Sequence, residues 1–595
     1  MYRTFLEIIS GFRKTLKLIG KQEKITLVLV SFLMLVNGVL TNLPALILGR
    51  LVDRMVGADN IQFNLAVPFI ALIVIIILVR EILTVIRKYF VENIATQTEK
   101  KQTIAILNHL LKTDVSVINN QQIGSLHGKI FRSIQGLVRT IKLGFLDFFP
   151  VLFSALAALA IAFSQKPLLA SVMILVIPTG LFIIIKQVSS QKGIRIALLR
   201  GKEKIDGAVV EMLGGLETVR VSNTTDYEVN KIEQVAEDLR KKEIKHHISM
   251  AFFDSGKYLN EGFFYIIVIS LSILFAAQGI ISRGDILVYS ILFLSITGPL
   301  REIHRILDEA HENSIRVNDL YELLEQPVDV SFMTHSVNSK SIIQDKKNVI
   351  ETNNLSFSYP NKSGKALNNI TFTIKNGEKI GIVGASGCGK STLVKVLLRL
   401  IHNYTGVVNL FGENLKNITR DEIGRKIAYV PQKTYIFSGT VQENITYGCL
   451  RKDISEEKIV SAVKKAHIYN EILDSLGGFS GRVGENGNNL SGGQKQRLAL
   501  ARLILKSPEL LIFDEATSAL DNTNEMLIQK NIEQLFKDKT MITIAHRLTT
   551  LKNTDRIFVF DKGKIVQEGT FNELSRDKGL FQDFLKQKEP LEQAV

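Results

Sequence analysis

The segment GASGCGKST, residues 384–392, contains three glycines and a lysine that is followed by two hydroxyl side chains. It satisfies the pattern G-x-x-x-x-G-K-[ST], in which a glycine-rich loop wraps phosphates with backbone N–H groups. An apolar run precedes it and a helical pattern follows, which predicts a strand, a phosphate loop and a helix whose N-terminus faces the anion. Lys390 then reaches the β and γ phosphates of a nucleotide, and Ser391 coordinates Mg²⁺. The candidate nucleotide-binding residues of the loop are Gly384, Ala385, Ser386, Gly387, Cys388, Gly389, Lys390, Ser391 and Thr392.

Two acids follow a second apolar run, ELLIFDEATSALD, at residues 509–521. The run predicts a buried parallel strand. Asp514, at its end, is placed to hold Mg²⁺ through water. Glu515 is placed to polarise an attacking water as general base.

The segment LSGGQKQRLALARL, from Leu490, runs from a glycine turn straight into a basic amphipathic helix. A serine hydroxyl and glycine N–H groups at a helix start form another anion site. Two such sites are excessive for one nucleotide, unless the second contacts a nucleotide held by another copy of the domain. Its candidate residues are Ser491, Gly492, Gly493 and Gln494.

These segments, in this order, resemble those of the ATP-binding cassette transporter superfamily, and the resemblance covers nearly the whole chain. LSGGQ is the signature sequence of that family and is highly specific. The resemblance implies four further roles: Tyr359 stacks on adenine, Gln432 links γ-phosphate and Mg²⁺ to the membrane domain, Asp521 contacts the dimer partner, and His546 senses the γ-phosphate. The implied catalytic residues are Glu515, His546, Gln432 and Lys390, and the implied metal ligands are Ser391, Gln432 and Asp514.

The first half of the chain lacks these nucleotide-binding motifs and has long apolar runs instead. A bilayer core needs about 20 mostly apolar residues per helix. Six such spans are expected before residue 323, at 25–48, 65–79, 143–163, 168–185, 262–281 and 286–300. Buried helices of a soluble protein are the alternative, but six such spans seldom occur in one soluble half.

The distribution of basic residues predicts the topology of the spans. The chain of 595 residues has a net charge of +15, which is compatible with nucleic acid, anionic lipid or the inner side of a membrane protein. Lys and Arg gather before the first span, between spans two and three, and between spans four and five. Because cytoplasmic loops are enriched in these residues, both termini are predicted to be cytoplasmic and nucleic acid is unnecessary.

The predicted fold is a membrane α-helical domain of six exporter-type transmembrane helices, followed by an α/β P-loop nucleotide-binding domain with a helical signature subdomain. Spans two to five are expected to continue as helices into the cytosol, with breaks at 111–130 and 214–228. The two cysteines have no metal-site or disulfide spacing. The predicted parts are an interfacial helix at 1–24, the transmembrane domain at 25–322, a linker at 323–347, the nucleotide-binding domain at 348–585 and a tail at 586–595.

The resemblance implies ATP-driven export, or inner-to-outer leaflet translocation, of an amphipathic substrate by alternating access in a dimer of half-transporters. ATP and Mg²⁺ are the implied cofactors. Every matched catalytic position keeps a family-typical residue, which favours a homodimer in the inner or plasma membrane of a bacterium. A heterodimer with a degenerate partner, an ATP-gated regulator and an organelle membrane remain open alternatives.

Charged residues at membrane depth are candidates for contact with the cargo. They are Arg80, Glu81, Asp147, Lys257 and Glu261. These side chains could line one inward-facing cavity, or they could be solvated or paired with one another. Their mixed signs leave lipid-linked molecules, peptides, amphipathic drugs and thiol–metal conjugates open as substrates.

Overall fold

The computed structural model describes residues 2–56, 63–115, 123–190, 193–333, 347–360, 364–449, 454–514, 530, 532–545 and 548–592. The chain divides into two compact units. The helical unit comprises residues 1–111 and 122–326, and the cassette unit comprises residues 112–121 and 327–595.

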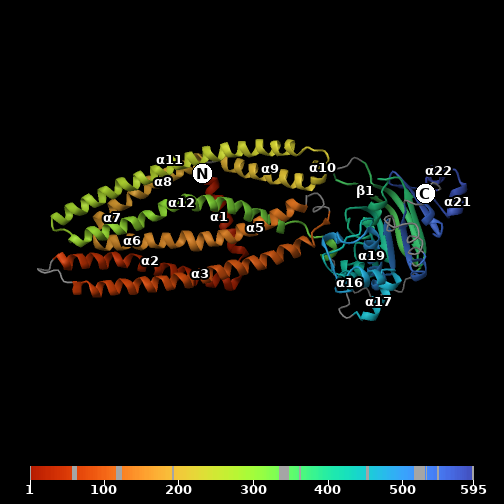
Figure 1. Ribbon diagram of the computed structural model, residues 1–595, viewed down its shortest axis with the longest axis horizontal. Helices are drawn as coiled ribbons and strands as arrows, with labels where there is room; N and C mark the ends of the chain where they lie inside the picture. The colour runs from red at the N-terminus through yellow and green to blue at the C-terminus, as the bar shows by residue number, and fades with distance from the viewer. Residues whose placement is uncertain are drawn as a thin grey trace. The chain divides into compact units, whose positions relative to one another are not determined.

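Long helices build the helical unit and lie alongside one another (Figure 1). They are α1 (Tyr2–Leu18), α2 (Lys21–Val56), η1 (Phe63–Leu65), α3 (Val67–Leu110), α5 (Ile123–Lys142), η2 (Leu143–Phe148), α6 (Phe149–Gln165), α7 (Pro167–Ile174), α8 (Val176–Ser190), α9 (Ile194–Gly214), α10 (Leu216–Val221), α11 (Thr225–Ala277) and α12 (Arg283–Leu324).

Among the described residues, six helical stretches are long and apolar enough to cross a membrane, and each overlaps one predicted span. They are Lys21–Val56, Phe63–Leu110, Leu126–Gln165, Pro167–Ser190, Thr225–Ala277 and Arg283–Leu324. The fifth ends at Ala277 instead of Ile281, because Gly279 takes a left-handed φ of 69° and the N–H of Ile280 turns back to the carbonyl of Phe275. The chain leaves the helical conformation at 111–114 and at 215 and 222–224, within the breaks predicted at 111–130 and 214–228, but both predicted breaks were too long, because α5 begins at Ile123 and α10 lies within the second.

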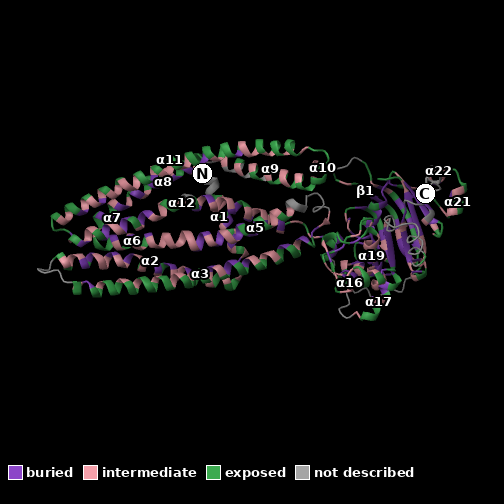
Figure 2. Cartoon of the chain, viewed as in Figure 1, coloured by how far each residue is buried: buried purple, intermediate pink, exposed green. Residues whose placement is uncertain are grey.

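Many residues of these helices are exposed (Figure 2), and large apolar residues are among them, as expected where lipid replaces water as the surroundings. On α3, the residues Ile75, Leu78 and Val85 are more than half exposed. The helices pack through buried apolar clusters, and they also meet at small and polar residues. A Cβ on Gly38 of α2 would lie 2.9 Å from the backbone of Phe153 in α6, and buried Asn42 donates to the carbonyl of Ser154 at 2.9 Å.

Strands and shorter helices build the cassette unit. They are α13 (Val330–Met333), β1 (Asn348–Phe357), β2 (Leu367–Lys375), β3 (Lys379–Gly384), α14 (Lys390–Leu397), β4 (Thr405–Leu410), β5 (Glu413–Asn414), α15 (Arg420–Lys426), β6 (Ile427–Val430), β7 (Gly439–Thr440), α16 (Val441–Thr446), α17 (Glu456–Lys465), α18 (Tyr469–Asp474), β8 (Arg482–Val483), η3 (Glu485–Gly487), α19 (Gly492–Lys506), β9 (Leu510–Asp514), β10 (Thr540–Ile544), η4 (Leu548–Leu551), β11 (Arg556–Asp561), β12 (Lys564–Gly569), α21 (Phe571–Arg576) and α22 (Leu580–Glu592).

The larger sheet of the cassette unit has the strand order β12-β11-β3-β10-β9-β6. All neighbouring pairs in it are parallel except β11 with β12. A smaller antiparallel sheet has the order β2-β1-β4-β5. The apolar runs KIGIV and LLIF form buried strands β3 and β9, as expected for a sheet covered on both faces.

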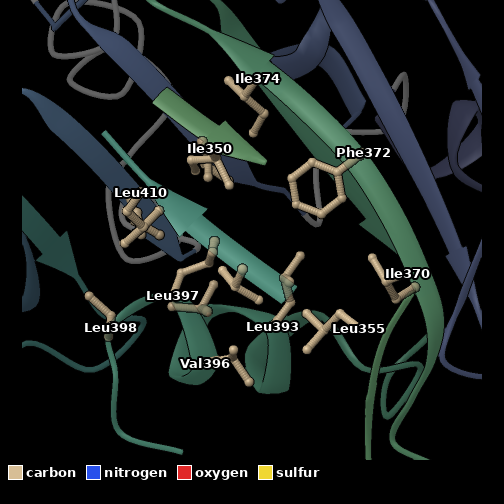
Figure 3. Packing of buried hydrophobic residues seen from close by; sticks show 14 of the residues in the cluster. Ile350, Leu355, Ile370, Phe372, Ile374, Leu393, Val396, Leu397, Leu398 and Leu410 are labelled. Atoms are coloured by element: carbon tan, nitrogen blue, oxygen red, sulfur yellow. The ribbon is translucent and has the colours of Figure 1, made fainter. Parts of the chain in front are cut away.

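Two separate hydrophobic cores hold the two helices that the motifs predict. The helix α14, after the phosphate loop, packs through Leu393, Val396 and Leu397 on both sheets, where it meets Ile350 and Leu410 (Figure 3). The helix α19, after the signature turn, packs in a second core with α16, α17 and α18. This arrangement confirms the predicted α/β domain with a helical subdomain.

Candidate nucleotide site

The candidate site lies at the carboxyl edge of the larger sheet, in the cassette unit. In β10, Ile544 is paired with Ile382 of β3 on one side and with Asp514 of β9 on the other. The carboxyl ends of β3, β9 and β10 therefore lie at the same edge of the sheet. Ligands of open parallel sheets bind outside this edge.

The phosphate loop after β3 has the geometry that its glycines predict. Gly387 and Gly389 have φ values of 81° and 113°, which L side chains rarely adopt. A Cβ on Gly389 would lie 2.5 Å from the carbonyl oxygen of Ala366, whereas a Cβ on Gly387 would meet open space. The backbone at Gly389 is therefore closely packed, whereas the space beside Gly387 is empty. A polyphosphate can approach the backbone N–H groups of the loop there.

Lys390 begins helix α14 and is only 7% exposed. Its ammonium donates to the carbonyl oxygens of Gly384 at 2.7 Å and Ala385 at 3.0 Å, and lies 3.7 Å from Sγ of Cys388. The cation is thus held inside the curve of the loop. Together with the N–H groups of the first turn of α14, it gives a site that fits an anion.

Tyr359 follows strand β1, and its ring lies next to this helix. Its hydroxyl is 3.4 Å from Oγ1 of Thr392, and its ring packs edge-on against Phe357 with centroids 4.9 Å apart. The structure therefore brings together Tyr359 and the phosphate loop, which are separated in the sequence by strands β2 and β3.

Asp514 lies at the end of β9, as predicted, and a tyrosine that the sequence motifs did not reveal contacts it. The hydroxyl of Tyr429, in the neighbouring strand β6, donates to Oδ2 of Asp514 at 3.2 Å. Burial, followed by the charge of Asp514 and this hydrogen bond, raises the pKa of Tyr429, so the hydroxyl remains a donor at neutral pH. Only the pairing of β6 with β9 could have revealed this contact.

Gln432 follows β6 and is exposed at the same edge of the sheet. Glu515, Asp521 and His546 lie outside the described residues. The last described residues before two of them are Asp514, the last residue of β9, and Ala545, the residue after β10.

The signature turn forms the N-terminus of α19. Ser491 caps the helix: its hydroxyl accepts from the N–H of Gln494 at 3.2 Å, and the side chain of Gln494 accepts from the N–H of Ser491 at 2.9 Å. Gly492 and Gly493 fall in the first turn, where backbone N–H groups have no partner within the helix. The turn therefore presents N–H donors at a helix N-terminus, in a different core from α14.

The five charged residues predicted at membrane depth each have an ionic partner in the helical unit. Arg80 pairs with its neighbour Glu81, with Nη2 and Oε1 2.5 Å apart. Lys257, only 8% exposed, lies 2.6 Å from Asp254, one turn earlier on α11. Of the five residues, Arg80 and Glu81 therefore pair with one another, whereas Lys257 pairs with a residue outside the predicted set.

The other two predicted carboxylates pair with arginines. Glu261 lies 3.3 Å from Arg301 of α12 and accepts from the hydroxyl of Thr297 at 2.7 Å. Asp147 lies 3.2 Å from Arg139 of α5 and 3.9 Å from Arg305 of α12. The prediction of charged residues at membrane depth did not include Arg139, Arg301 or Arg305. The spacing of Arg301 and Arg305, one turn apart on α12, was a signal that could have pointed to two of them.

Asp147 sits in η2, a π-helical turn between α5 and α6. The N–H of Phe149 bonds to the carbonyl of Gly144, five residues back. The next residue, Pro150, has no N–H for an α-helical bond, which explains why the helix widens here. π-Helical turns are frequent at functional sites.

Comparisons with known proteins match each unit to one family model. The model described as ABC transporter transmembrane region matches residues 27–300, and the model described as ABC transporter matches residues 367–518. In fold, the chain is similar to a solved structure described as a bacterial Atm1-family ABC exporter with ATP bound. The TM-score is 0.82, with 22% identity, 96% of this chain and 98% of that chain covered.

Curated relatives include a protein of Rickettsia bellii named "Putative export ATP-binding/permease protein", which is 30% identical over 95% of both chains. An iron-sulfur clusters transporter ATM1, mitochondrial, of Chaetomium globosum is 35% identical over 64% of this chain. The match spans 62% of that relative, so the chain covers less than two thirds of its length. The chain belongs to the ABC transporter family, and it joins a multi-pass membrane domain and an ATP-binding domain in the layout of a half-transporter.

Proposed function

We propose that this chain is one half of an ATP-driven exporter that moves an amphipathic substrate across a membrane, or from its inner to its outer leaflet, by alternating access. One observation carries the proposal: a phosphate loop follows a parallel strand of the larger sheet in the same chain whose described residues include six helices apolar enough to cross a membrane. The export named for the Rickettsia bellii relative supports it.

In this proposal, the described residues of the cassette bind and orient ATP. The loop N–H groups and Lys390 bind the phosphates, and Tyr359 stacks on adenine. The set of Ser391, Gln432 and Asp514 would hold Mg²⁺, and all three offer oxygen donors near one edge of the sheet. When bound, Mg²⁺ neutralises charge that develops on the transferred phosphoryl group.

Three residues outside the described ranges complete the proposed hydrolysis. Glu515 takes a proton from the attacking water, and His546 senses the γ-phosphate. Asp521 contacts the second copy. Glu515 and His546 directly follow Asp514 and Ala545 in the sequence, and the pairing of β9 and β10 with β3 puts the carboxyl ends of these strands at one edge of the sheet, which supports the proposed roles.

A second copy of the chain is the proposed partner. The phosphate loop and the signature turn belong to separate cores, and each offers N–H groups to an anion. A nucleotide held by one chain's Lys390 would therefore be closed over by the other chain's Ser491. A heterodimer with a degenerate partner, or an ATP-gated regulator, would share this layout.

The proposed location is the inner or plasma membrane of a bacterium, with both termini cytoplasmic. The basic residues between the spans support this orientation. The predicted domain bounds, 1–24, 25–322, 323–347, 348–585 and 586–595, stay proposals. The helices run across three of the limits, since α2 already begins at Lys21, α12 ends at Leu324 and α22 continues through Glu592.

Transport by the purified chain tests the function. Proteoliposomes with cassettes facing outward would receive labelled lipids, peptides, cationic drugs or glutathione conjugates, with and without MgATP. We expect ATP-dependent accumulation of one of these classes in the lumen, and none with a Lys390→Ala chain. Accumulation that is independent of ATP would support a channel instead.

A further inference from the structure

The segment after α12 carries a buried carboxylate, Asp329, that lies in the cassette unit and is 3% exposed. Its Oδ1 accepts from the backbone N–H of Ser331 at 2.7 Å and lies 3.0 Å from Nε2 of His402. Its Oδ2 accepts from Nη2 of Arg420 at 3.2 Å. Both carboxylate oxygens are therefore fixed by groups from separate parts of the cassette.

Arg420 connects this carboxylate to the helix of the phosphate loop. Its Nη1 donates to the carbonyl of Leu398 at 2.8 Å, and its Nη2 donates to the carbonyl of Arg399 at 2.5 Å. These carbonyls directly follow the C-terminus of α14, where the helix dipole favours a cation. The N-terminus of the same helix carries Lys390, and eight residues of helix span roughly 12 Å.

The backbone of the same segment joins a second stretch of chain. The N–H of Asp329 donates to the carbonyl of Lys112 at 2.7 Å, and the N–H of Asp114 donates to the carbonyl of Pro327 at 3.2 Å. Between them, Thr113 and Val328 form an antiparallel bridge. Residue 112 follows α3 by two positions and residue 327 follows α12 by three, so both described segments leave helices that contain candidate membrane spans.

We propose that Asp329 and Arg420 are positioning residues that couple phosphate binding at the N-terminus of α14 to the movement of segments 112–114 and 327–333. This coupling path is continuous: phosphate loop, α14, Arg420, Asp329, and then the carbonyl of Lys112. Each step is a covalent bond or a hydrogen bond within the cassette unit. The proposal rests on the proposed function, because it concerns how ATP binding moves the membrane domain.

The test uses a single fluorescent reporter, because the chain contains no tryptophan. Tyr89→Trp places the reporter on α3, at a side chain that is 66% exposed. Full-length chains in lipid nanodiscs receive MgATP, and phosphate release and tryptophan emission are recorded together. The coupling variants are Asp329→Asn and Arg420→Lys. Arg425→Gln is the matched control, because it breaks an exposed ion pair with Asp421 on the same helix, α15.

We expect the reporter chain to hydrolyse ATP and to change its emission. In both coupling variants, hydrolysis should stay within about twofold while the emission change falls about fivefold or more, the lower range of an allosteric coupling energy. The control should match the reporter chain. Hydrolysis and emission that fall in parallel, or that both stay intact, would overturn the coupling path.

A third variant changes the same contacts without removing a charge, so a loss of coupling in it is less easily explained by misfolding. Ser331→Ala removes a hydroxyl that accepts from Nε of Arg420 at 3.1 Å and leaves both charges in place. It should lower the emission change more than it lowers hydrolysis, and equal losses would again contradict the coupling path. A reporter chain that binds a fluorescent ATP analogue yet neither hydrolyses ATP nor changes emission would contradict the proposed function, and the coupling path with it.

Discussion

The hydroxyl of Tyr429 and the carboxylate of Asp514 are joined by a 3.2 Å hydrogen bond between adjacent strands. The hydroxyl of Tyr429 therefore orients the carboxylate of Asp514, and it does so from β6, the strand at the edge of the sheet. Residues that orient a metal ligand commonly matter almost as much as the ligand.

Replacing this tyrosine should therefore raise the Mg²⁺ concentration needed for ATP hydrolysis more than it lowers kcat. In Tyr429→Phe, we expect the Mg²⁺ concentration for half-maximal ATPase to rise about tenfold, with a smaller change in kcat. Mg²⁺ titrations of phosphate release measure both. Tyr469→Phe, on α18, is the control. An unchanged Mg²⁺ requirement would contradict the positioning role of Tyr429.

The phosphate loop offers a matched pair of glycines. Gly389→Ala introduces a Cβ 2.5 Å from the carbonyl of Ala366 at a φ of 113°, so we expect it to lose ATP binding and to lower stability. Gly387→Ala meets no protein atom within 4 Å at a φ of 81°, so its loss of stability should be only the strain of a left-handed residue, about 1–2 kcal/mol. Binding of a fluorescent ATP analogue and thermal unfolding compare the two. Equal losses in both variants would contradict the close packing at Gly389.

The two-copy site predicts a cross-link that depends on nucleotide. The test chain carries Ser386→Cys and Ser491→Cys, with Cys388 and Cys449 replaced by serine. A short bifunctional thiol reagent should give a covalent dimer with MgATP and little without it. Chains with one introduced cysteine should stay monomeric on a denaturing gel. Cross-links formed only within single chains would contradict the proposed dimer site.

The buried carboxylate Asp329 predicts a pH dependence of cassette stability. Burial raises its pKa, but hydrogen bonds from Ser331 and the charges of His402 and Arg420 outweigh burial, so the pKa lies below its ordinary value. Because the folded-state pKa is the lower one, the stabilisation is complete above about pH 4 and is lost as pH falls through the folded-state value.

Asp329→Asn should accordingly lower the free energy of unfolding at pH 7 by about 1–3 kcal/mol, the cost of leaving buried partners unsatisfied. Thermal unfolding at pH 7 and at about pH 3.5, below the ordinary pKa of an aspartate, measures the difference between the two chains. The difference should narrow at the lower pH. A difference that is as large at acidic pH would show that the carboxylate charge is not responsible.

The sequence predicted the helices of the membrane domain well, because an apolar run of about 20 residues matches the thickness of a bilayer core. Their ends were less predictable. Helix α2, which contains the first predicted span, begins at Lys21, because Lys, Gln and Glu are good helix formers even outside an apolar run. The π-helical turn at Asp147 comes just before Pro150. A proline alone does not specify such a turn, because the turn also depends on the helices packed around it.

The candidate nucleotide site could be proposed from the sequence to the extent that its chemistry is local. The phosphate loop, Asp514 and the Ser491 turn each occupy one short segment with a defined spacing. Tyr429 and Asp329 could not be found this way, because each acts through a partner on a distant strand or helix. Their contacts follow from sheet order and packing, which the sequence encodes only through the whole fold.

ATPase activity of the purified chain in lipid nanodiscs, beside a Glu515→Gln chain, tests the proposed exporter directly. We predict basal hydrolysis that is stimulated by one class among lipids, peptides, drugs and glutathione conjugates. In Glu515→Gln, ATP should still bind while turnover falls about 100-fold or more, as expected when a general base is removed. A wild-type chain that binds ATP without hydrolysing it would contradict a self-sufficient exporter, and undiminished hydrolysis by Glu515→Gln would contradict the assigned base.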